Sequence, residues 1–226
     1  MASADPHRRA VLWDLDGTLA DSREYHWRSW LEAMALEGVR ITEEDFAASF
    51  GQRNDAILTA WLGADVDPAR MQRVAATKEE AYRRMVREEG IEPLPGAAEW
   101  VRALHETGWR QAIASSAPRA NVDVMQGALH FQGFIDTLVS AEDVLRGKPD
   151  PEVFLAAAAR LGVPPERCIV VEDAAAGIEA GRAGGMKTVG VGPGETEAAD
   201  VVVPSLAELP EGVFERLLGE GIRGSD

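Results

Sequence analysis

The sequence contains a single cysteine, Cys168, so no disulfide can form between its own residues. A disulfide-held scaffold is therefore excluded, and a reducing cytoplasm is the expected location. No apolar run approaches the ~20 residues that a membrane span requires. The first nine residues also lack the apolar centre of a signal peptide. We expect a cytoplasmic protein that has no membrane partner.

Cations are scarce in this chain. Its 226 residues include 23 lysines and arginines against 38 aspartates and glutamates, which gives a formal net charge of −15. Such a surface repels phosphate backbones, so no nucleic-acid partner is expected. An anionic small substrate would need a local cluster of cations or a metal ion. The apolar share of 46% is that of an ordinary globular protein and excludes a disordered chain.

Short β-rich apolar runs recur along the chain, and most end in turn-forming or acidic residues. Nearly continuous apolar runs are typical of parallel strands that are buried on both faces. Helical patterns, such as Val122 with Met125 and Leu129, lie between these runs. The alternation predicts an α/β fold with a doubly wound, Rossmann-like parallel sheet. The expected strands are 10–13, 111–114, 137–139, 168–171, 188–191 and 201–203.

One long insertion interrupts this alternation. About ninety residues separate the first two strands, far more than a crossover helix needs. Residues 22–93 show helical periodicity, and a Pro-Leu-Pro-Gly segment follows them. We expect a small helical cap domain at 22–93 and an α/β core domain formed by 1–21 and 94–226. Ligands of open α/β sheets bind at the carboxyl ends of the strands, so this cap would cover the site.

The first strand ends in Asp14-Leu15-Asp16-Gly17-Thr18. In an extended strand, residues two apart share a face, so the two carboxylates should converge. Adjacent anions repel one another unless a cation lies between them or one is protonated. The alternative for this stretch alone is a solvated Asp-Gly turn. A calcium loop fails, because Leu19 and Tyr25 occupy the positions of its glycine and glutamate.

A second acidic pair, Glu172 and Asp173, ends the fourth strand. Taken alone, Asp173 could simply cap the following helix. Beside Asp14 and Asp16, however, the pair indicates a site for Mg²⁺, which prefers oxygen ligands.

Two further stretches carry groups that suit a phosphate. Ser115 and Ser116 end the second strand, and Lys148 precedes a helix that we expect to begin at Pro151 with Asp150 as its cap. A hydroxyl and a lysine beside a helix N-terminus are typical of phosphate sites. The serines and the lysine are each common in proteins when taken alone, but their occurrence together, in this order on alternating strands, is a specific pattern.

Taken together, the chain resembles the haloacid dehalogenase superfamily. All four of its motifs occur in order over residues 9–205: the segment Asp14–Thr18, then Ser115, then Lys148-Pro149, then Glu172-Asp173. The dehalogenating branch lacks the second aspartate, so the resemblance implies phosphoryl transfer. It also implies that Asp14 is the nucleophile and Asp16 the general acid and base, that Ser115 and Lys148 hold the transferring phosphoryl group, and that Mg²⁺ binds Asp14, Asp16, Glu172 and Asp173.

Within the superfamily, the insertion resembles the helical cap of β-phosphoglucomutases. The segment from Asp21 to Trp30 is similar to the opening of that cap, and Lys78 with Tyr82 to a later helix. Lys78 lies on an apolar stripe, so it either snorkels at the edge of that stripe or reaches the cleft. His26 lies at the margin of another stripe, and the mutases use that histidine in closing the cap.

Departures from the mutase pattern favour hydrolysis. Gly51-Gln52-Arg53-Asn54 places the cap arginine one position early, and Pro118-Arg119 replaces a lysine and an asparagine. We expect a phosphatase of a small phosphorylated sugar or polyol, with a sugar phosphomutase and a non-catalytic binding protein as alternatives. A monomer or weak homodimer is expected. The expected substrate contacts are His26, Arg53, Lys78, Ser116 and Arg119.

Overall fold

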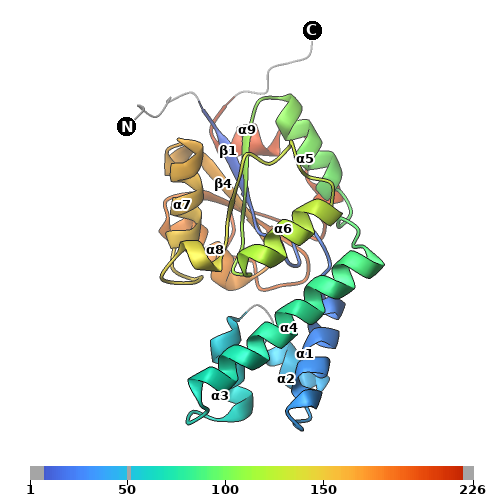
Figure 1. The fold of residues 1–226 in the computed structure, drawn as a ribbon. Helices are drawn as coiled ribbons and strands as arrows, with labels where there is room; N and C mark the ends of the chain where they lie inside the picture. Colours follow the sequence, from blue (N-terminus) through green and yellow to red (C-terminus); the bar gives the residue numbers. More distant parts are fainter. Residues whose placement is uncertain (1–7, 50–51, 221–226) are drawn as a thin grey trace.

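A six-stranded, fully parallel sheet forms the centre of the protein (Figure 1). The computed structural model describes residues 8–49 and 52–220; the first seven residues, used above to exclude a signal peptide, and Gly51 of the cap segment lie outside them. The strand order is β3-β2-β1-β4-β5-β6, so the expected doubly wound α/β fold is confirmed. The strands are β1 (Ala10–Trp13), β2 (Arg110–Ala114), β3 (Thr137–Val139), β4 (Cys168–Glu172), β5 (Lys187–Val191) and β6 (Val201–Val203).

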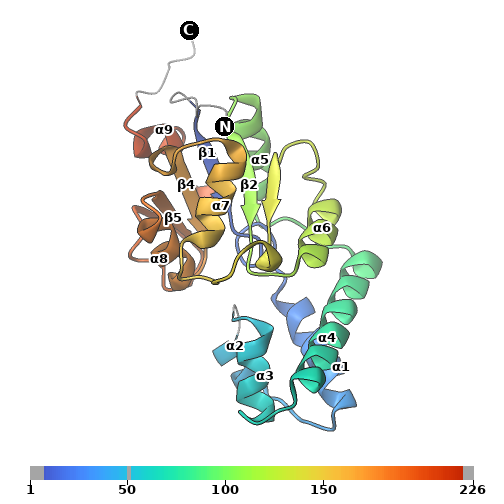
Figure 2. The ribbon, with the colours of Figure 1, turned by 60° about the vertical axis from the view of Figure 1, so that its left-hand side comes forward.

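Helices cover both faces of this sheet, which explains why the strands are apolar throughout. Alternate residues of β1 enter different cores: Val11 and Trp13 pack under α5, α6 and α9, whereas Ala10 and Leu12 pack under α7 and α8 (Figure 2). These helices are α5 (Ala97–Glu106), α6 (Arg119–Ala128), α7 (Glu152–Leu161), α8 (Ala175–Ala183) and α9 (Val213–Leu217). Three short 3₁₀ turns lie at Ala141–Asp143, Pro165–Arg167 and Leu206–Glu208.

Four helices between β1 and β2 form a separate body beyond one end of the sheet (Figure 1). They have an apolar core of their own, which includes Trp30, Phe46 and Leu58. The helices are α1 (Arg23–Leu36), α2 (Glu43–Ser49), α3 (Asn54–Leu62) and α4 (Pro68–Glu89). We refer to this body below as the cap. Among the described helices of the chain, none is both long and apolar enough to cross a membrane.

The two segments that join the cap to the sheet pair with each other. Ala20 forms an antiparallel bridge with Pro93, and the Leu94 N–H donates to the Leu19 carbonyl at 2.9 Å. The chain therefore enters and leaves the cap at one place.

The register of β1 positions the candidate site. Trp13 pairs with Ile113 of β2 on one side and with Val171 of β4 on the other. The residues that follow these strands therefore meet at one edge of the sheet, which faces the cap. Strand order reverses between β1 and β4, and ligands of open α/β sheets bind at such a point.

Candidate active site

Three carboxylates meet where β1 and β4 end. Oxygen atoms of Asp14, Glu172 and Asp173 all lie within 4.8 Å of one another. Glu172 is the last residue of β4, and the chain turns after it, so consecutive acidic residues reach the same place. Asp173 does not cap α8: its carboxylate accepts from the Thr18 hydroxyl at 3.3 Å, and the α8 N-cap, Ala174, has no side-chain cap.

Lys148 neutralises part of this acidic cluster. Its ammonium donates to Asp14 Oδ1 and to Glu172 Oε1, both at 2.6 Å, and to the Ala114 carbonyl at 3.2 Å. Burial opposes its charge, but the two carboxylates raise the pKa of Lys148 above its ordinary value. The helix after this lysine begins at Glu152, one residue later than expected. Asp150 nevertheless accepts from its first N–H at 3.0 Å.

The cluster fits a divalent cation. Burial and the neighbouring carboxylates raise the pKa of Asp14, and burial together with Glu172 raises that of Asp173 to about 7. These shifts reflect buried negative charge that Lys148 does not fully offset. Carboxylate oxygens are the ligands that Mg²⁺ prefers. The donor set of Asp14, Glu172 and Asp173 is therefore suited to Mg²⁺.

The carboxylate of Asp16 faces the cap rather than this cluster. β1 ends at Trp13, and Asp16 forms an isolated bridge with Ala20, so the strand alternation assumed from the sequence no longer applies there. Its Oδ1 accepts from the Ser22 hydroxyl at 2.5 Å and contacts His26 Nε2 at 3.2 Å and the Tyr82 hydroxyl at 3.3 Å. Burial opposes the charge of Asp16, but these hydrogen bonds and the cationic surroundings lower its pKa to about 2.

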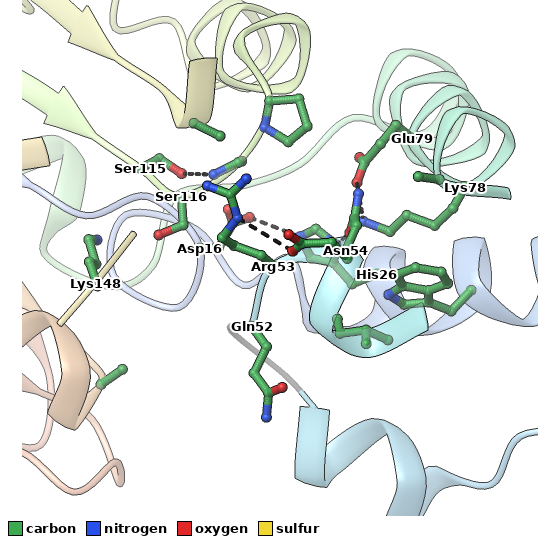
Figure 3. Close-up of a pocket in the computed structure, with 18 of the residues that line it drawn as sticks. Asp16, His26, Gln52, Arg53, Asn54, Lys78, Glu79, Ser115, Ser116 and Lys148 are labelled. Carbon is green, nitrogen blue, oxygen red and sulfur yellow. Dashed lines mark hydrogen bonds and ion pairs between the residues drawn. The ribbon is translucent and has the colours of Figure 1, made fainter. Parts of the chain in front are cut away.

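A cavity of about 430 Å³ lies between the strand ends and the cap (Figure 3). The structure brings ten of the sequence-predicted site residues to its wall: Asp14, Asp16, His26, Arg53, Lys78, Ser115, Ser116, Lys148, Glu172 and Asp173. Arg119 is the exception: it is not among the lining residues, and its guanidinium pairs with Asp123 at 2.9 Å.

Lys78 is almost completely buried, with 2% of its surface exposed. Its ammonium contacts His26 Nδ1 and Glu79 Oε1, each at 2.9 Å. Of the two placements expected from the sequence, Lys78 therefore takes the one that faces the cleft, not the one at the edge of its apolar stripe. Burial lowers the pKa of Lys78, and burial with the Lys78 charge lowers that of His26.

Sequence reasoning did not single out Ser22 or Glu79, although both contact site residues. The Ser22 hydroxyl donates to Asp16 Oδ1, and the Glu79 carboxylate forms an ion pair with Lys78. The signal available for Glu79 was its place next to a lysine on an apolar helical stripe. It was not sufficient, because adjacent residues of a helix normally face different directions.

Two glycines allow the carboxylates to approach one another. Gly17 has a φ of +91°, and a Cβ there would lie 2.1 Å from Asp173 Oδ2. A Cβ on Gly177 of α8 would lie 1.9 Å from the Glu172 carboxyl group.

Gly177→Ala is therefore expected to displace the Glu172 side chain and to lower kcat/KM by about tenfold or more, since an ångström of misplacement costs about 10²-fold. Gly127→Ala in α6 is the matched control, because its Cβ would meet only the end of the Gln132 side chain at 3.3 Å. Steady-state kinetics on both variants check this. Equal activities in the two variants would contradict it.

These observations define a class of protein. A parallel α/β core presents an acidic cluster, a lysine and hydroxyls at its strand ends beneath a helical cap, and these groups suit an enzyme that binds a phosphate beside a divalent cation. The model of the haloacid dehalogenase-like hydrolase family matches residues 8–185, and the chain belongs to this family. The resemblance inferred from the motifs is thus confirmed.

Characterised relatives include both phosphatases and mutases. The chain is 34% identical over 185 residues to fructose-1-phosphate phosphatase of Escherichia coli, covering 80% of this chain and 95% of the relative. It is 31% identical over 213 residues to hexitol phosphatase B of the same organism, covering 88% and 93%. The crystal structure of β-phosphoglucomutase from Clostridium difficile superposes with a TM-score of 0.84 at 26% identity, covering 94% of this chain and 97% of that one.

Proposed function

We propose that this protein is a Mg²⁺-dependent phosphatase that hydrolyses a small phosphorylated sugar or polyol through an aspartyl phosphate. The observation that carries the proposal is the placement of Asp14. This carboxylate accepts from the Lys148 ammonium at 2.6 Å, has an oxygen within 4.8 Å of oxygens of Glu172 and Asp173, and lines the cavity together with Asp16. Two phosphatase relatives that act on such compounds support the substrate class.

In the first step, an Asp14 oxygen attacks phosphorus while the bond to the leaving oxygen breaks, and Asp16 donates the proton that this oxygen takes. The phosphate dianion of a bound substrate raises the pKa of Asp16 by like-charge repulsion, which favours the protonated form that this step needs. Ser115 and Lys148 hold the phosphoryl oxygens.

In the second step, water attacks the phosphorus of the aspartyl phosphate and Asp16 accepts a proton from this water. The bond between phosphorus and the Asp14 oxygen breaks, which releases inorganic phosphate and regenerates the Asp14 carboxylate. The hydrogen bonds from Ser22, His26 and Tyr82 favour the carboxylate form for this role. Asp14, the main-chain carbonyl of Asp16, Glu172 and Asp173 would hold Mg²⁺, which when bound offsets the repulsion between nucleophile and phosphate. The cap excludes bulk water, and His26, Arg53, Lys78 and Ser116 face the substrate.

A sugar phosphomutase is the second candidate, because a β-phosphoglucomutase shares this fold over nearly the whole chain. Incubation with β-glucose 1-phosphate separates the two activities: a phosphatase releases inorganic phosphate, and a mutase yields glucose 6-phosphate. We expect phosphate release. A lag abolished by glucose 1,6-bisphosphate, with glucose 6-phosphate as product, would establish the mutase instead.

Arg53 provides a further test, because its side chain is 45% exposed and its guanidinium pairs only loosely with Asp55, at 3.4 Å. If one phosphate is bound at Ser115 and Lys148, Arg53 contributes affinity for the leaving group alone. Arg53→Ala should then raise KM by about tenfold and leave kcat nearly unchanged, as expected for a partly solvated charged contact. Arg40→Ala, which removes an exposed cap arginine that does not line the cavity, is the control. Collapse of kcat in Arg53→Ala would favour a two-phosphate grip and hence the mutase.

A further inference from the structure

A buried carboxylate, that of Glu79, lies at the boundary between the cap and the core. Glu79 is 6% exposed and is satisfied on both oxygens. Its Oε1 accepts from Asn54 Nδ2 of α3 at 2.7 Å and from the Lys78 ammonium at 2.9 Å. Its Oε2 accepts from Asn121 Nδ2 of α6. A buried charge that lost one of these donors would be strongly disfavoured, so the arrangement is tightly specified.

Among these three donors to Glu79, Asn121 is the one that belongs to the core, so its hydrogen bond joins the core to the cap. Its side chain is 1% exposed and is held on both sides by α4, because its Oδ1 also accepts from Arg83 Nη1 at 2.9 Å. Asn121 is not among the residues that line the cavity, so it does not contact a substrate there. It belongs to none of the motifs that define the family.

A series of side-chain contacts connects this amide to Asp16, the proposed general acid and base. Asn121 contacts Glu79, Glu79 holds Lys78, Lys78 contacts His26 Nδ1, and the opposite ring nitrogen of His26 contacts Asp16. The His26 ring is also stacked on Tyr82, with 4.4 Å between ring centroids, so it has little freedom to compensate for a displaced lysine.

We propose that Asn121 and Glu79 are positioning residues. Their hydrogen bond, called the clasp below, holds the cap against the core. Acting through Lys78 and His26, it aligns Asp16 for proton transfer. The inference rests on the proposed function, since it takes Asp16 as the general acid. Neither Asn121 nor Glu79 forms or breaks a bond in the reaction.

The identity of the leaving group makes this role measurable. When the bond from phosphorus to a sugar oxygen breaks, the departing alkoxide needs the proton from Asp16. p-Nitrophenolate is stable as an anion and leaves without one. Misalignment of Asp16 therefore slows transfer from an alkyl phosphate much more than transfer from p-nitrophenyl phosphate. Both kcat/KM values report the step that forms the aspartyl phosphate.

The experiment compares wild type, Asn121→Ala and Glu79→Gln on p-nitrophenyl phosphate and fructose 1-phosphate. We expect the ratio of the two kcat/KM values to shift by about tenfold or more against fructose 1-phosphate in both variants, a fraction of what general acid catalysis contributes. The ratio is taken from one preparation, so a partly unfolded sample does not alter it. Glu32→Gln is the control, because Glu32 of α1 pairs on the cap surface with Arg84 of α4, the helix that carries Glu79, at 2.6 Å. Its ratio should stay within about twofold of wild type.

A second readout does not depend on activity. The imidazole ¹⁵N shifts of His26 at fixed pH should move in Asn121→Ala and Glu79→Gln but not in Glu32→Gln. Unchanged His26 shifts with an unchanged ratio would overturn the clasp, leaving Asn121 a purely structural residue. If wild type hydrolyses no phosphate ester, the proposed function fails, and the His26 shifts still decide whether the clasp exists.

Discussion

Asp14→Asn is expected to abolish turnover while leaving the fold intact. An amide is a poor nucleophile, so no aspartyl phosphate forms, and a loss of at least ~10³-fold follows from removing one member of a catalytic unit. The thermal midpoint should hold or rise, because burial and the neighbouring carboxylates already disfavour the charge of Asp14. Phosphate-release kinetics and thermal unfolding measure the two effects.

The control for this substitution is Asp65→Asn, an exposed residue in the turn before α4. It should retain wild-type activity. Activity of Asp14→Asn within tenfold of wild type would show that Asp14 is not the nucleophile.

Chelation of the metal has the second large expected effect. Three carboxylates face one ammonium group in the cluster, so a divalent cation restores neutrality. EDTA should eliminate activity and Mg²⁺ restore it. Ca²⁺ should bind without supporting turnover, because its longer and looser coordination misplaces the nucleophile. Activity assays across metal concentrations measure this.

Thermal unfolding provides the control for the metal assignment. A ligand that binds only the folded state raises the unfolding temperature. Mg²⁺ should therefore stabilise wild type, and much less so Asp173→Ala, which should need more Mg²⁺ for activity. Full activity in excess chelator would exclude the cluster as a metal site.

The sheet and the strand-end residues were predictable because their signals are local. All six expected strands occur, with ends within one residue of those predicted from apolar runs. Neighbouring parallel strands place their carboxyl ends together, so Asp14 had to meet Glu172 once β1 was adjacent to β4. Ser115 follows from the same rule, because it comes directly after β2, whereas Lys148 lies in the loop between β3 and α7 and was expected from the helix that begins just after it.

The cap contacts were not predictable in this way. The direction of Asp16 depends on a turn that local alternation does not encode, and the pairing of Glu79 with Asn121 depends on how two separately folded bodies meet. Arg119 is a different case: its place in the sequence suggested the cleft, but Asp123, one helical turn later in α6, pairs with its guanidinium, which is a local contact.

The pairing of Ala20 with Pro93 also bears on how enzymes of this type diverge. Because the chain leaves the core and returns to it at one point, the length of the intervening segment does not set the register of the strands. The acidic cluster at the strand ends and the cap residues that line the cavity are therefore carried by separate parts of the chain. Changes confined to the inserted helices can therefore reshape one wall of the cavity without repacking the strands that form the other.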